Sequence, residues 1–228
     1  LASTAMDFSK NWVAGSSSPE IIFAYVNNSR ASSPLNFTLY VNDTDGSWNY
    51  APSDWCYSSL FADDNTLSRK GDVRSKATFT SQDANRVIKY PNGTYQLAET
   101  SDYTCTPVVI SRISEMYLVK AEALGKTNGA AALVEYMKKR YTTAPSEAAI
   151  KALSDKEYQT LILDERRREF YAEGMRWQDI KRTNRLELLE TLDGRTYLMY
   201  YPIPQDEIDM AGTVAYPQNP GYAGYTGN

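Results

Sequence analysis

The chain has 228 residues, with 24 Lys and Arg, 28 Asp and Glu and no histidine, which gives a net charge of −4 and a pI near 5.0. The absence of histidine excludes Ser-His-Asp and Cys-His catalysis and almost every zinc site, so acid–base chemistry would have to use carboxylates, Tyr or Lys. The acidic balance, without a separate basic patch, argues against a nucleic acid partner.

The first 107 residues are rich in Asn, Asp, Ser, Thr and Gly, with short β-like runs at residues 21–26 and 37–41. Tyr is abundant, at 18 residues, and Tyr and Trp suit the half-wet surfaces that bind carbohydrates or proteins. A disulfide between Cys56 and Cys105 would close a loop of about fifty residues. The sequence leaves open whether this disulfide forms.

Helical periodicity begins after Pro107. We expect a first helix at residues 111–124, stopped by Gly125, and a second at 130–141. Joined by the short turn GKTNG, these two helices should form an antiparallel hairpin. The residues expected to face inward are Ile113, Met116, Tyr117, Ala121 and Leu124 in the first helix and Leu133, Tyr136 and Met137 in the second.

A third helix is expected at residues 146–153, and a fourth begins after Ser154, with Glu157 as its capping-box partner, and continues to about residue 173. Gly174 breaks it, and a short helix follows at 175–182, in which Trp177 is expected to belong to the core. Residues 197–201 resemble a strand leading into a rigid Pro-Ile-Pro. The tail beyond is rich in Pro and Gly and should fold back over the helices.

Three carboxylates, Glu165, Glu169 and Glu173, recur every four residues and so share one face of the fourth helix. They could form a metal site or the acid–base pair of a glycosidase. We favour a structural interpretation, a partly buried ion network that also includes Arg112 and Glu115, because like charges at this spacing need neutralising partners. The expected partners are Arg166, Arg167, Arg168, Arg176 and Arg182.

Four segments resemble the SusD/RagB family of surface lipoproteins, which capture nutrients, usually glycans, for an outer-membrane transporter. They are ILDERRREFYAEGMRWQDIKR (162–182), YYPIPQDEI (200–208), YPQNPGY (216–222) and SRISEMYLVKAE (111–122). One departure is the sequence EYMKKR in the second helix, where the family has Asn-x-x-Arg. The resemblance implies a mainly α, SusD-like fold with tetratricopeptide-like helical hairpins, long irregular loops and short β-strands.

The resemblance also implies an organisation along the chain. Residues 1–107 would form a loop-rich, ligand-facing region, and residues 108–228 a helical SusD-like region forming one compact unit. The segment PEIIFAYV (19–26) is similar to the family segment that precedes the ligand-facing loops, and KGDVR (70–74) to the one that follows them. Because family members are longer, the chain is interpreted as the C-terminal portion of a larger protein.

Between these two segments lies DTDGSWNYAPSDWCY (43–57), which combines aromatic rings with acidic and amide groups. Sugar rings stack on aromatic faces, and their hydroxyls need polar partners. We predict Trp48 and Tyr50 as the platform, with Asn42, Asp45 and Asn49 as polar partners. The alternative is that Trp48 and Trp55 anchor a loop onto the helices.

The resemblance implies a non-catalytic binding protein with no cofactor, catalytic residue or metal ligand. Its partners would be an oligosaccharide and a SusC-like TonB-dependent transporter, with no nucleic acid. It would lie on the outer face of the outer membrane, held only by an N-terminal lipid anchor absent from this chain. A peptide receptor of the same family is one alternative. A glycoside hydrolase is another, although no pair stands out among Asp43, Asp45 and Asp54.

Overall fold

The structure is a computed structural model that describes residues 1–13, 18–26, 51–80, 86–90, 106–189, 192, 194–212 and 216–223. It contains two compact units, residues 1–173 and 174–228. Neither unit ends near residue 107, where the composition of the sequence changes. The predicted ligand-facing role of residues 1–107 stays a prediction.

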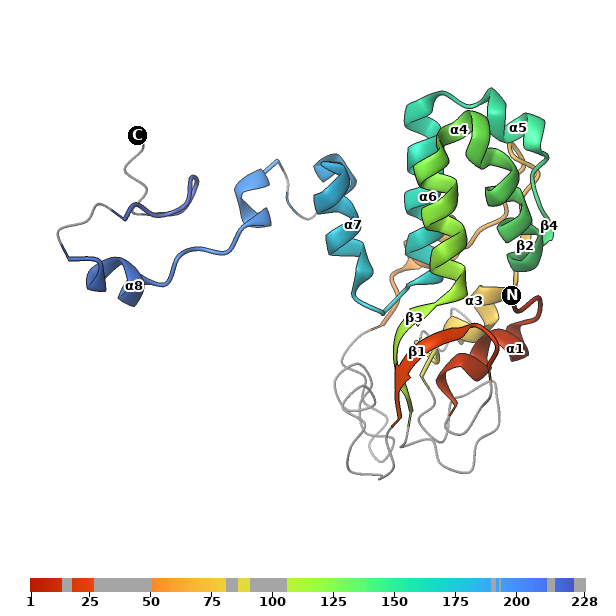
Figure 1. The fold of residues 1–228 in the computed structure, drawn as a ribbon, viewed down its shortest axis with the longest axis horizontal. Helices are drawn as coiled ribbons and strands as arrows, with labels where there is room; N and C mark the ends of the chain where they lie inside the picture. The colour runs from red at the N-terminus through yellow and green to blue at the C-terminus, as the bar shows by residue number, and fades with distance from the viewer. Residues whose placement is uncertain are drawn as a thin grey trace. The chain divides into compact units, whose positions relative to one another are not determined.

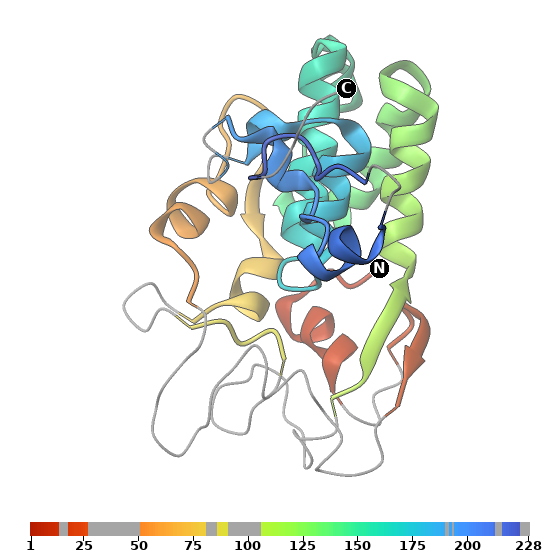
Figure 2. The ribbon, with the colours of Figure 1, turned by 90° about the vertical axis from the view of Figure 1, so that its left-hand side faces the viewer.

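In the first unit, the helices α4, α5 and α6 lie above α1, α3 and the strands β1 and β3 (Figures 1 and 2). Two short helical turns, Lys10–Trp12 and Cys56–Leu60, accompany α1 and the segment before β2. The elements of this unit are α1 (Ala5–Ser9), β1 (Ile21–Tyr25), β2 (Lys70–Asp72), α3 (Val73–Thr78), β3 (Val108–Arg112), α4 (Ile113–Arg140), β4 (Tyr141–Thr143), α5 (Glu147–Ala152) and α6 (Asp155–Glu169).

Two antiparallel strand pairs connect distant parts of this unit. β1 pairs with β3, so that Ile21 lies opposite Arg112, and β2 pairs with β4, so that Asp72 lies opposite Tyr141. The predicted strand at 21–26 is therefore confirmed, while the one at 37–41 lies outside the described residues. The first helix was placed two residues too early, because residues 111 and 112 complete the ladder of β3.

The helical hairpin is confirmed. Gly125, with φ 66° and ψ 175°, interrupts α4 and divides it into two halves that run side by side (Figure 1). The hydroxyl of Tyr117 lies 3.3 Å from a carboxylate oxygen of Glu135. In a continuous helix, a separation of 18 residues would span about 27 Å. The two halves are therefore antiparallel.

The inward face of the first half differs from the prediction. Ala121 is buried as predicted, but Met116 and Leu124 are 43% and 45% exposed, and the other buried residues are Ser114 and Leu118. Arg112, a member of the buried ion network described below, donates to Ser114 Oγ at 2.9 Å. This hydrogen bond directs the Ser114 face of α4 inward. In the second half, the predicted inward residues Leu133, Tyr136 and Met137 are all fully buried.

Local signals placed the next helices well. Ser146 caps α5, and Ser154 and Glu157 form the expected capping box at the start of α6. α6 ends at Glu169 instead of continuing to residue 173. The chain then leaves helical geometry, with Ala172 at φ 61° and Gly174 at φ 79°.

The second unit contains α7 (Met175–Thr183) and α8 (Gln205–Met210) with short 3-10 turns between them, at Leu186–Leu188 and Thr196–Met199. The short helix predicted at 175–182 is confirmed, and Trp177 is half-buried against a small core that includes Ile180. The strand predicted at 197–201 is wrong, because the chain forms a 3-10 turn there.

The C-terminal tail folds back on the Pro-Ile-Pro segment within this second unit. The side chain of Gln218 accepts from the backbone N–H of Ile203 at 2.7 Å and donates to its carbonyl at 2.8 Å. The hydroxyl of Tyr222 donates to the carbonyl of Tyr200 at 2.6 Å. Two of the segments that resemble the SusD/RagB family are thus hydrogen-bonded to each other.

Candidate functional site

The five residues predicted to bind ligand, Trp48, Tyr50, Asn42, Asp45 and Asn49, lie outside the described residues. Their role therefore stays a prediction. The structure does describe the segments on either side of them, β1 and residues 51–61. The contacts of these two flanking segments with the rest of the first unit are described next.

The strand before the predicted site exposes aromatic side chains. Phe23 and Tyr25 on β1 are 49% and 60% exposed, and their rings meet edge to face at 5.2 Å between centroids. The described part of β1 thus exposes two aromatic rings in the segment that precedes the predicted site in the sequence.

The segment after the predicted site is fixed to the last turns of α6. The guanidinium of Arg167 lies 4.3 Å from the centre of the Trp55 ring, and Arg168 Nε donates to the carbonyl of Leu60. Cys56 Sγ lies 3.5 Å from the hydroxyl of Tyr171. Trp55 thus contacts α6, while Trp48, the other residue of the anchoring alternative, lies outside the described residues.

Cys56 is buried and forms no disulfide with another described residue, and Cys105 lies outside the described part of the chain. The Cys56 side chain belongs to a hydrophobic cluster that includes Leu60, Phe61 and Phe79. A disulfide is not needed to bury this thiol.

The predicted ion network exists and lies in the interior of the first unit. Glu169, with no exposed surface, binds three guanidiniums: Arg112 at 2.6 Å, Arg140 at 2.9 Å and Arg74 at 3.3 Å. The Tyr136 hydroxyl donates to the same carboxylate at 2.8 Å. Burying a carboxylate is tolerated when it is paired and hydrogen-bonded in this way.

Glu165, one turn earlier on α6, is held similarly. It accepts from Arg74 and Arg168, each at 2.9 Å, and from the hydroxyl of Tyr141 at 2.6 Å. Among the described residues, ion pairs join five cations and five carboxylates into one buried ion network. Its members are Arg74, Lys89, Arg112, Arg140, Arg168, Glu20, Asp72, Glu165, Glu169 and Glu173.

The electrostatics keep both central carboxylates ionised. Burial alone would raise the pKa of Glu169, but the charges of Arg140 and Arg112 outweigh it and hold this pKa well below its usual value. For Glu165, burial is likewise outweighed by Arg74 and Arg168, and its pKa is lowered. Burial raises the pKa of Tyr136 and Tyr141 well above the usual value, so both phenols remain protonated donors.

Lys89 closes the C-terminal end of α6. Its ammonium donates to the backbone carbonyls of Glu169 and Tyr171, each at 2.9 Å, and also to the carboxylate of Glu173. Burial lowers its pKa to about 8, against the opposing charge of Glu173. A cation at this position also opposes the negative end of the helix dipole.

The predicted partners of the three glutamates were mostly wrong. Among the described ion pairs, Arg168 is the one guanidinium of the predicted set that binds them, and Arg166 instead approaches Glu115 at 3.5 Å. The main partners, Arg74, Arg112 and Arg140, are 29 to 95 residues away in sequence. Of these, the prediction included Arg112 in the network. Spacing along one helix gives no information about partners on other elements.

The network connects the parts of the chain that surround the predicted site. Glu20, just before β1, forms a double hydrogen bond with Arg140 at 3.0 and 2.9 Å. Arg74, in the KGDVR segment, binds both oxygens of Asp72 at 2.8 and 2.7 Å as well as Glu165 and Glu169. Glu20 and Arg74 are thus fixed to the same centre.

This centre is not suited to acid–base catalysis. Glu165 and Glu169 have no exposed surface, so a sugar cannot reach them. Both are ionised and already accept hydrogen bonds on both oxygens. A glycosidase needs two carboxylates on either side of an accessible glycosidic bond. The network therefore supports the structural interpretation of the three glutamates.

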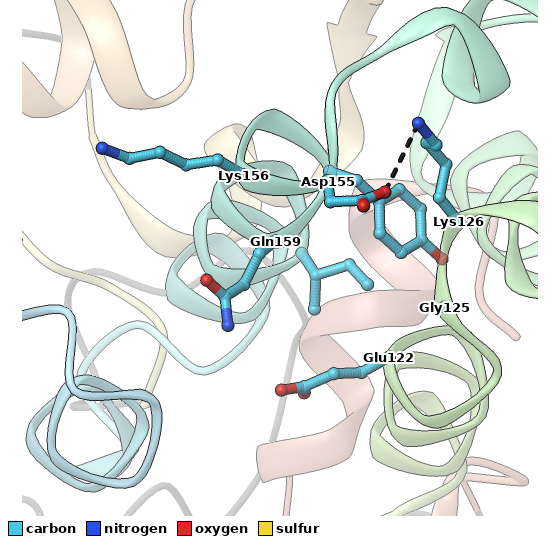
Figure 3. Close-up of a pocket in the computed structure, with 8 residues that line it drawn as sticks. Glu122, Gly125, Lys126, Asp155, Lys156 and Gln159 are labelled. Atoms are coloured by element: carbon cyan, nitrogen blue, oxygen red, sulfur yellow. Dashed lines mark ion pairs between the residues drawn. The ribbon is translucent and has the colours of Figure 1, made fainter.

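A hollow of about 340 Å³ lies between the bend of α4 and the start of α6 (Figure 3). Lys126, on its rim, donates to the carbonyl of Leu153 at 2.6 Å and lies 3.4 Å from Asp155. These contacts hold the two helices together. Among the described residues that line this hollow, Tyr158 is the one aromatic side chain, and it is buried.

Two further properties concern the described residues alone. No cluster of three or more Cys, Asp or Glu side chains there is arranged to hold a metal ion. None of the helices found there has the length and the apolar character that crossing a membrane requires.

Comparisons with known proteins give one family. The family model described as SusD family matches residues 37–196. A crystal structure of a SusD superfamily protein from Bacteroides fragilis NCTC 9343 is similar, with a TM-score of 0.58 and 21% sequence identity. The match covers 95% of this chain and 54% of that one, so the chain spans about half the length of this relative. The curated proteins contain no match.

Proposed function

The chain belongs to the SusD family, and on this premise we propose that it is a non-catalytic receptor that captures oligosaccharides at the cell surface. The observation that carries the proposal is the family match over residues 37–196, which includes all five predicted ligand residues. Membership in this family supports a role in binding nutrients during glycan uptake.

The mechanism is capture on a preformed surface. Trp48 and Tyr50 supply faces on which a sugar ring stacks, and Asn42, Asp45 and Asn49 bind its hydroxyls. Exposed platforms of this kind bind weakly, since ordering the ligand and side chains offsets much of the contact energy. Weak binding allows release to the next component of an uptake system.

That component would be a SusC-like TonB-dependent transporter, with the full-length protein anchored by lipid on the outer face of the outer membrane. The buried ion network supports the receptor role, because it keeps α6 and the flanks of the predicted site in one arrangement. A fixed scaffold lowers the entropy lost on binding.

The test is binding of a glycan panel to the longest soluble form of the protein, measured by calorimetry, with Trp48→Ala and Tyr50→Ala as variants. We expect saturable binding of one glycan class and an affinity loss of about tenfold in either variant. Tyr201→Ala removes a ring that is 90% exposed in the other unit and is the matched control.

Three results would contradict the proposal. Absence of binding to every glycan would direct attention to peptides, the alternative ligand class. Loss of the sugar with time through cleavage would indicate a glycosidase. Unchanged affinity in both variants would show that the platform lies elsewhere.

A further inference from the structure

Trp55 is an unusual surface residue. It is 43% exposed, whereas Trp is among the most buried side chains on average. It lies directly before the helical turn Cys56–Leu60 and outside the ligand set predicted from sequence. Its exposure needs an explanation other than core packing.

The indole is backed by a cation. The guanidinium of Arg167 lies 4.3 Å from the ring centre, a distance typical of a cation–π contact. A planar guanidinium covers one face of the indole. With Arg167 against the ring, 43% of the Trp55 side chain is still exposed.

The segment that carries Trp55 is fixed on both sides of the turn. Cys56 and Leu60 are buried, and their contacts with Tyr171 and Arg168 attach the turn to the end of α6. Phe61 and Phe79 pack edge to face at 5.1 Å beneath it. The exposed indole is thus held on a rigid base.

Polar residues neighbour Trp55 in the sequence. Ser53, Asp54, Ser58 and Ser59 are exposed on the same turn or directly before it. Ser53 Oγ lies 3.7 Å from Cys56 Sγ, and Ser58 Oγ donates to the carbonyl of Asp54 at 3.0 Å. This surface offers an apolar face beside hydroxyls and a carboxylate, the combination that matches the C–H face and the hydroxyls of a pyranose.

We propose that Trp55, positioned by Arg167, is a stacking subsite for one pyranose unit of a bound oligosaccharide. The proposal rests on the oligosaccharide-binding function proposed above and adds a subsite at a described residue that follows the predicted platform in the sequence. Trp55 contacts the sugar, and Arg167 is a positioning residue that holds the indole in the binding orientation.

The experiment is calorimetric titration of the full chain with the glycan that the wild type binds best. Trp55→Ala is expected to lower the affinity about tenfold and Trp55→Phe less, because Phe keeps a smaller stacking face. Tyr201→Ala is the matched control and should bind like the wild type. Thermal unfolding of each variant checks that the fold survives.

Arg167→Gln tests the positioning role with a readout that loss of stability alone would not produce. The fluorescence of Trp55 is obtained as the difference between the emission of a protein with Trp at position 55 and that of the otherwise identical protein with Phe there. In Arg167→Gln without ligand, this emission should have a lower anisotropy and a longer wavelength than in the wild-type background. Arg167→Lys should restore part of the affinity, because it keeps the cation. Unchanged emission in Arg167→Gln would overturn the positioning role.

The outcomes for the two proposals are distinguishable. If Trp48→Ala weakens binding and Trp55→Ala does not, the subsite is wrong and the receptor function stands. If Trp55→Ala weakens binding, the subsite is supported whatever the effect at position 48. If the wild type binds no glycan, both proposals fail.

Discussion

At the scale of single residues, the most consequential side chain is Glu169. It joins Arg74, Arg112 and Arg140, which come from three different parts of the chain. A buried ion pair contributes little net stability compared with a well-packed apolar core, but removing one partner leaves charge buried without compensation. Loss of this carboxylate should therefore be far more harmful than a count of its ion pairs would indicate.

We expect Glu169→Gln to lower the free energy of unfolding by about 3–5 kcal/mol, because three buried guanidiniums lose their shared anion. Urea denaturation followed by circular dichroism measures this. Glu135→Gln, on the exposed side of α4, is the control and should change stability by less than about 0.5 kcal/mol. A loss of less than about 1 kcal/mol in Glu169→Gln would mean that the network relaxes or admits water.

The sequence predicted some members of the ion network and not others. The four-residue spacing of Glu165, Glu169 and Glu173 predicted an ion network, and all three belong to it, although Glu173 lies beyond the end of α6 and not on its face. The spacing could not identify Glu20, Arg74 or Lys89 as members of the network. Ion-pair partners can be up to 95 residues apart in the sequence, and the tertiary fold brings them together.

At the scale of elements, the close approach within the α4 hairpin depends on Gly129. A Cβ added there would clash with the Ala121 carbonyl and lie 2.7 Å from the hydroxyl of Tyr158. That hydroxyl donates to the same carbonyl at 2.8 Å. Gly129 therefore lets the second half of α4 pack directly on the first.

Gly129→Ala should destabilise the protein by about 1–3 kcal/mol through overpacking. Inside an ordinary helix, Gly→Ala would instead raise the stability by about 1 kcal/mol. The sign of the stability change therefore distinguishes a tight hairpin from an ordinary helix. Thermal unfolding of this variant, next to the exposed neighbouring substitution Asn128→Ala, measures the difference. A gain in stability in Gly129→Ala would show that the hairpin is looser than described.

Elements defined by local chemistry were predicted well, whereas of the strands, which are defined by pairing, β1 alone was predicted among the described residues. Capping side chains and glycine stops placed α5, both halves of α4 and the start of α6. β3 was missed and a strand at 197–201 was wrongly expected, because a strand exists only where another strand satisfies its backbone groups. β1 and β3, which pair, are more than 80 residues apart.

At the scale of the whole molecule, the buried carboxylates connect stability to pH. The pKa values of Glu165 and Glu169 are lowered in the folded state. In the unfolded chain, the pKa of a Glu side chain is about 4.3. Their contribution is therefore fully present above the unfolded pKa and is lost as the pH falls through the folded pKa.

The free energy of unfolding should accordingly decrease steeply as the pH falls from about 5 to about 3, because the unfolded chain binds more protons in this range. Urea denaturation across this range measures the slope. Glu165→Gln should flatten it, while Asp155→Asn, whose side chain is 94% exposed, should not. An equal slope in Glu165→Gln would assign the acid sensitivity to other groups.

The sequence by itself determined the family, the mainly α character, the helical hairpin and the existence of a charged centre on α6. These follow from periodicity, capping and short motifs, which act over a few residues. Only the tertiary structure decided which arginines bind Glu165 and Glu169, that Ser114 rather than Met116 faces inward, and that Trp55 stands exposed against Arg167. Burial and ion pairing depend on segments far apart in the chain, which come together only when the fold forms.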